Sequence, residues 1–82
     1  MKIIPLNELG PEESAEILSV GGRGVIKRRL LEMGIVPGNS ITMVRFAPLG
    51  DPLEYKLEGC LLSLRREEAK GVMVIVKERG DE

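Results

Sequence analysis

The sequence predicts a mainly β fold: a small, partly closed β-barrel of about five to six short strands with one α-helix. The chain has 82 residues, a length that supports one core and one domain, 1–82. Short segments of alternating apolar and polar residues recur between glycine and proline turns, and one segment alone has helical periodicity. Closure of a barrel removes exposed strand edges. An open five-stranded α+β sheet is the structural alternative.

The first predicted strand spans 14–20 (SAEILSV) and ends at a glycine pair. From there the period changes, and we expect a helix over about 23–33, with Ile26, Leu30 and Met33 on one buried stripe. Gly34 directly follows this helix, where a left-handed backbone suits glycine.

The second half of the chain continues as a meander. The Pro37-Gly38 pair predicts a type II turn, and the segment 47–52, with two prolines and a glycine, predicts a loop. The remaining expected elements are strands at 41–46, 53–57, 61–64 and 72–76, at most a helical turn near 65–69, and a flexible polar tail at 78–82.

The charges of the chain nearly cancel. Twelve basic residues stand against 13 acidic ones, and Phe46 and Tyr55 are the two aromatic residues. A dedicated nucleic-acid binder is expected to be basic and to carry aromatic stacking groups, so no nucleic-acid partner is expected. The N-terminus does not resemble a signal peptide, and no segment approaches the roughly 20 apolar residues of a membrane span. These features predict a cytoplasmic protein without direct membrane insertion.

The residues for catalysis or metal binding are scarce. The sequence contains no histidine and a single cysteine, Cys60. A nucleophile therefore lacks its usual base, and a transition metal lacks imidazole and paired thiolate ligands. We expect Cys60 to pack as a small apolar residue at a strand bend, and we read Glu67-Glu68 as a solvated pair. The sequence thus predicts no enzyme, no cofactor and no metal site.

The segment LLEMGIVPGNSITMVRFAPLGDPLEYKLEGCLLSLRREEAKGVMV resembles the core of the FeoA family. The matching pieces are the helix end Arg29–Gly34, the Pro37-Gly38 turn, the 47–52 loop and the strand exit Leu62–Arg65. The resemblance implies an SH3-like β-barrel, a domain that also occurs at the C-terminus of DtxR-type iron-dependent repressors. It further implies an accessory role in bacterial ferrous iron uptake, with the cytoplasmic region of the FeoB membrane transporter as partner. Location would then be cytoplasmic, next to the inner membrane through that partner.

Two features are candidates for partner binding. The first is the proline-stiffened stretch Leu49, Gly50, Asp51, Pro52 and Leu53, because an apolar side chain on a stiff loop loses little entropy when it docks. Its alternative is that the leucines fold onto the barrel, an interpretation that the alternation of Leu53 with Tyr55 favours for Leu53.

The second candidate is the cluster of cations Arg23, Lys27, Arg28 and Arg29 along the expected helix. Cations near a helix start oppose its dipole, and such a patch can steer an acidic partner. A solvated helix face is its structural alternative.

Two other functional interpretations stay open: a small nucleic-acid-binding barrel and a general protein-interaction SH3-like barrel. A freestanding repressor is excluded, because a recognition helix and a dimerisation domain do not fit in this length. Weak self-association through the apolar loop is also left open.

Overall fold

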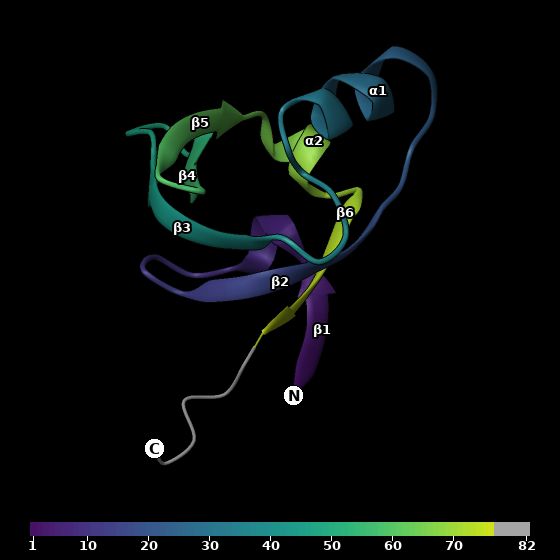
Figure 1. The fold of residues 1–82 in the computed structure, drawn as a ribbon. Coiled ribbons are helices and arrows are strands. Elements are labelled where there is room, and N and C mark those ends of the chain that lie inside the picture. Colours follow the sequence, from purple (N-terminus) through teal and green to yellow (C-terminus); the bar gives the residue numbers. More distant parts are fainter. Residues whose placement is uncertain (77–82) are drawn as a thin grey trace.

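The structure, a computed structural model, describes residues 1–76 and contains one antiparallel sheet of six strands (Figure 1). Spatial order in the sheet is β1-β6-β2-β3-β4-β5. The elements along the chain are β1 (Lys2–Pro5), the 3-10 turn η1 (Leu6–Glu8), β2 (Ser14–Val20), α1 (Gly24–Glu32), β3 (Ser40–Phe46), β4 (Leu53–Leu57), β5 (Cys60–Leu64), α2 (Arg66–Ala69) and β6 (Val72–Val76). The predicted mainly β class and the five predicted strands are confirmed.

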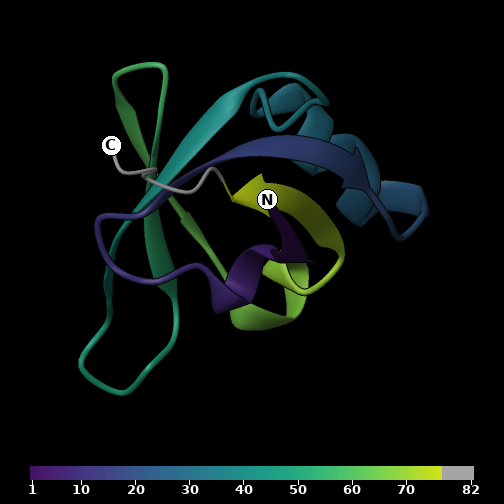
Figure 2. The same ribbon diagram turned by 90° about the horizontal axis from the view of Figure 1, so that it is seen from below.

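The sheet is curved rather than flat, as the two views in Figures 1 and 2 show. Strand register shifts between Ile17 and Ser19 where β2 pairs with β6, and between Met43 and Arg45 where β3 pairs with β4. An extra residue in one strand bends that strand and increases its twist. These two irregularities allow the sheet to wrap around one core, while β1 and β5 remain its two edges.

The tight turns follow the chemistry of their residues. Gly38 has φ of +99°, and the Asn39 amide donates to the Val36 carbonyl at 3.2 Å, which agrees with the predicted type II turn. Between β4 and β5, Glu58 and Gly59 both have positive φ, at 51° and 83°. Positive φ at both central residues is typical of the two-residue hairpin turn whose twist matches its strands.

The sequence interpretation missed the N-terminal elements. Strand β1 pairs antiparallel with β6, with Lys2 opposite Val76, and η1 follows it directly. The strand has four residues and ends in proline, so it offers no alternation long enough to recognise. Nevertheless Leu6 and Leu9, at either end of η1, are 0% and 1% exposed. The N-terminal segment therefore contributes two side chains to the core.

The core is apolar, and no charged side chain within residues 1–76 is buried in it. Alternation along the strands directs its members inward, as in β4, where Leu53, Tyr55 and Leu57 are buried. The buried side chains are Leu6, Leu9, Ala15, Ile17, Val20, Leu30, Ile35, Ile41, Met43, Leu53, Tyr55, Leu57, Leu64, Ala69, Val72 and Val74.

Helix α1 begins one residue later than predicted, and Leu30 is its one buried residue. Leu30 is 1% exposed, but Ile26, which we expected on the buried stripe, is 52% exposed, so that expectation was wrong. Figure 1 shows the connection from β2 swinging out to the side before α1 runs back toward the sheet. The first turn of the helix therefore lies beyond the surface that could cover Ile26.

The helix ends as predicted at Gly34, which has φ of +98°. The amide of Ile35 donates to the Leu30 carbonyl at 3.1 Å, and the Asn39 side chain donates to the Gly34 carbonyl at 2.8 Å.

No helix among residues 1–76 has the length and apolar character to cross a membrane. The predicted tail at 78–82 lies outside the described residues.

Candidate functional site

The 47–52 loop, which joins β3 to β4, presents a single leucine to solvent. Leu49 is 96% exposed. The loop closes on itself through the Gly50 amide, which donates to the Ala47 carbonyl at 2.7 Å, and the Ala47 amide, which donates to the Pro52 carbonyl at 3.0 Å. Figure 2 shows the loop projecting from the sheet. Leu49 therefore projects outward instead of folding back onto the barrel.

Leu53, the other leucine of the predicted binding stretch, does not share this exposure. It begins β4 and is 0% exposed, as the alternative core interpretation proposed. A fully buried side chain has no surface for a partner to contact. The binding candidate is therefore limited to the loop itself, with Leu49 as its apolar side chain.

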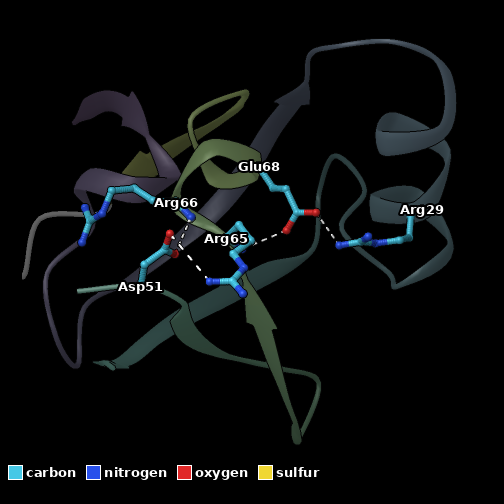
Figure 3. Close-up of polar contacts among 5 residues, drawn as sticks. All are labelled: Arg29, Asp51, Arg65, Arg66 and Glu68. Carbon is cyan, nitrogen blue, oxygen red and sulfur yellow. Dashed lines mark hydrogen bonds and ion pairs between the residues drawn. The ribbon is translucent and has the colours of Figure 1, made fainter. Parts of the chain in front are cut away.

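Helix α2 holds this loop through the residues drawn in Figure 3. The backbone amide of Arg66 donates to Asp51 Oδ1 at 2.9 Å, and Arg66 Nη2 donates to the Gly50 carbonyl at 2.7 Å. The Arg66 guanidinium also lies over the Phe46 ring, 5.8 Å from its centroid. A weaker ion pair joins Arg65 to Asp51 at 4.0 Å. The loop is thus attached to α2 at two consecutive residues.

The predicted basic cluster lies at the start and along the outer side of α1. Arg23 precedes the first helical residue and Arg28 is exposed, whereas Lys27 is half-buried. Within the described part of the chain, none of these three cations has an ion-pair partner. Their charge therefore remains available to an external group.

Exposed aliphatic side chains accompany the cations on α1. Val25 is 77% exposed, Ile26 52% and Leu31 36%. A surface that combines cations with aliphatic groups suits a protein partner that offers both carboxylates and apolar contact.

Arg29, the fourth cation of the cluster, differs from the other three because it is paired. It donates through Nη2 to the Glu68 carboxylate of α2 (Figure 3). The same carboxylate accepts the backbone amide of Arg65 at 2.8 Å, and its side chain is only 11% exposed. Our expectation of a solvated Glu67-Glu68 pair was wrong for Glu68. Helix α2 thus contacts both predicted binding features: α1 through Glu68 and the loop through Arg66.

The role of α2 was missed in the sequence, where only its helical turn was expected. A signal was present: Glu68 is three residues after Arg65, the spacing at which a carboxylate returns to the amide at a helix start. The contact with Arg29 spans 39 positions in the sequence, and no local pattern indicates it.

No cluster of three potential metal ligands occurs among residues 1–76. Cys60, expected in a packed position, is instead exposed, so that expectation was wrong. It begins β5 directly after the hairpin turn, and β5 is an edge strand that pairs on one side only, with β4. Among the features predicted from the sequence, the structure thus joins the exposed Leu49 loop and the cationic helix α1 through α2.

A family model described as the FeoA domain matches residues 4–76. An Fe(2+) transport protein A/Fe(2+) transporter FeoB fusion protein from Porphyromonas gingivalis is 48% identical over 69 residues, covering 84% of this chain and 8% of the relative. The chain therefore spans under a tenth of that relative's length.

Two solved structures are also similar. The FeoA-like protein from Clostridium acetobutylicum has a TM-score of 0.86 and 35% identity, with 96% of this chain and 92% of that one covered. The zinc complex of Stenotrophomonas maltophilia FeoA, described as a procaryotic SH3 domain protein, has a TM-score of 0.72 and 37% identity, covering 88% and 87%. The predicted SH3-like barrel is thereby confirmed.

Proposed function

Because this chain belongs to the FeoA family, we propose that it is a non-catalytic accessory protein of bacterial ferrous iron uptake that binds the cytoplasmic region of a FeoB-type transporter. The observation that carries the proposal is the surface described above: a held loop that exposes Leu49, joined through α2 to a helix that, with Arg23 before it, presents three cations without an ion-pair partner among residues 1–76. The relative from P. gingivalis supports the choice of partner, since it is described as a fusion of Fe(2+) transport protein A with the transporter FeoB.

The two surface features have different physical roles in this proposal. The aliphatic side chain of Leu49 supplies contact area in a pocket, which determines how slowly a complex dissociates. The cations Arg23, Lys27 and Arg28 attract an acidic surface and raise the association rate. Together they favour an acidic partner site with an apolar pocket.

The domain acts, in this proposal, by binding two conformations of the transporter with different affinity. A ligand shifts a conformational equilibrium only by the difference in its affinity for the two states. Assembly or conformational coupling requires no group to enter the nucleotide site, in contrast to an arginine finger. The domain would be cytoplasmic and would lie next to the inner membrane through its partner.

The test is a titration of isotope-labelled protein with the cytoplasmic region of a FeoB-type transporter, in GDP and in a non-hydrolysable GTP analogue. We expect amide shifts at residues 47–52 and along α1. We also expect Leu49→Ala to weaken binding by about tenfold, as truncation of an apolar anchor does. The matched control is Leu61→Ala, because Leu61 is an exposed leucine, 64% accessible, on the edge strand β5.

The absence of shifts in both nucleotide states, and with the whole transporter in nanodiscs, would contradict the proposal. Shifts produced equally by an unrelated acidic protein would show charge attraction alone. Shifts that grow with protein concentration and no partner would instead support self-association through the loop.

A further inference from the structure

Within the described residues, the 47–52 loop forms no hydrogen bond or ion pair with a strand of the sheet. Its two backbone hydrogen bonds join loop residues to one another. Within residues 1–76, every polar contact between this loop and the rest of the chain comes from Arg65 or Arg66. Internal bonds keep a loop closed, but they do not fix its direction relative to the body of the protein.

Arg66 makes the closest of these contacts, through its backbone amide and through its side chain. Its backbone amide holds Asp51 at 2.9 Å, its Nη2 holds the Gly50 carbonyl at 2.7 Å, and its guanidinium covers the Phe46 ring. The contact from Arg65 is a 4.0 Å pair between side chains that are 67% and 42% exposed, and such pairs stabilise little. Arg66 is therefore the main attachment of the loop.

We propose that Arg66 is a positioning residue: it holds the 47–52 loop so that Leu49 is a preformed anchor for an apolar pocket in the partner. This inference rests on the proposed function for its partner. The physical reason is preorganisation, because a loop that is already ordered loses less conformational entropy when it binds. The planar guanidinium suits this role, since it can donate to a carbonyl while its face covers an aromatic ring.

The experiment compares wild type with Arg66→Gln and Arg66→Lys. Arg66→Gln removes both the positive charge and the planar guanidinium. Arg66→Lys keeps the positive charge and removes the planar guanidinium, so the pair of variants separates geometry from electrostatics. The matched control is Arg45→Gln, because Arg45 is also an arginine at this end of β3, and it pairs with Glu54, which lies outside the loop.

The first readout is the backbone order parameter of Leu49 and Gly50 in the free protein. We expect values near about 0.8 in wild type and Arg45→Gln, and below about 0.6 in both Arg66 variants. The second readout is the affinity for the FeoB-type transporter, which should fall about five- to tenfold in both Arg66 variants. If Arg66→Gln does not fold, Arg66→Lys decides.

Unchanged order parameters in both Arg66 variants would overturn the inference. So would unchanged affinity in a variant whose loop has become disordered, since the loop conformation would then not determine binding. If wild-type protein does not bind the transporter, the proposed function fails and the affinity effect with it. The order parameters of the free protein still decide in that case whether Arg66 holds the loop.

Discussion

Tyr55 is the residue at which this apolar core accommodates a polar group. Its side chain is 0% exposed, and its hydroxyl donates to the Leu6 carbonyl at 3.1 Å, joining β4 to η1. Burial raises the pKa of the Tyr55 phenol well above its ordinary value, and the positive charge of Arg66 opposes this rise. The phenol therefore stays neutral and keeps donating in alkaline solution.

Replacement Tyr55→Phe should lower the free energy of unfolding by about 1–3 kcal/mol at pH 7, because a buried carbonyl loses its donor. In wild type, the raised folded pKa means that stability is complete below about pH 10 and falls above it, as the unfolded tyrosine ionises first. The difference between the two proteins should thus shrink by about 1 kcal/mol at pH 11. Urea unfolding followed by circular dichroism measures both values; a constant difference would contradict this account.

Gly34 and Gly38 offer a matched test of two steric effects. Both have φ near +98° or +99°, but a Cβ at Gly34 would lie 2.9 Å from Leu57 Cδ2, whereas one at Gly38 would meet nothing within 4 Å. We expect Gly38→Ala to cost about 1 kcal/mol from backbone strain alone. Gly34→Ala should cost about 1 kcal/mol more, because the neighbour must also move. Equal losses in thermal unfolding would show that Leu57 yields freely.

Residue roles could be predicted only where neighbours in sequence determine them. The turn glycines and the alternating side chains of β4 follow from local patterns, and the structure confirms them. The exposure of Cys60 and Ile26 depends instead on which strand is an edge and how far a helix projects. Likewise, the partner of Glu68 comes from a helix 39 positions away. Such properties arise only once the elements are assembled.

At the scale of elements, α1 and α2 depend on different forces. Helix α1 has nine residues, starts at a glycine and carries no acidic residue in its first turn, so its own sequence stabilises it weakly. It is retained by Leu30 in the core and by the Arg29 contact with Glu68. Helix α2 is a single turn; the amide of Arg65, the residue before it, donates to the Glu68 carboxylate, and Ala69 is buried.

Replacement Leu30→Ala should therefore destabilise the fold by about 2–5 kcal/mol, the range for a leucine removed from a packed core. Val25→Ala on the same helix should change stability by less than about 0.5 kcal/mol, since that side chain is 77% exposed. Urea unfolding monitored by circular dichroism checks both. Comparable losses in the two variants would mean that the outer face of α1 is also packed.

Considered as a whole molecule, the protein is nearly neutral, but its charge is unevenly placed. The net charge is -1, while α1 and its first flanking residue present three cations without an ion-pair partner among residues 1–76. The barrel fold and most strand positions could be predicted, since the alternation of apolar and polar residues along a strand indicates which of its side chains are buried. The joint surface could not, because the predicted loop and helix are connected only by long-range contacts through α2.

The double replacement Lys27→Glu/Arg28→Glu should slow association with the FeoB-type transporter by about tenfold at low salt, with a smaller effect at high salt. Stopped-flow measurement at two ionic strengths tests this. The control is Lys2→Glu/Lys56→Glu, which changes the net charge equally at two exposed positions on β1 and β4. Equal slowing by both pairs would show that net charge matters and the position on α1 does not.

The pairing of β1 with β6 has a consequence for how this domain can be linked to other proteins. Lys2 lies opposite Val76 in the sheet, so the described chain enters and leaves at adjacent points. Figure 1 shows those points at the end of the molecule away from α1 and α2. A covalent tether attached there, at either side of the domain, would leave the opposite surface unobstructed. The same architecture can therefore be joined to a longer polypeptide at either side without change to the surface formed by α1 and α2.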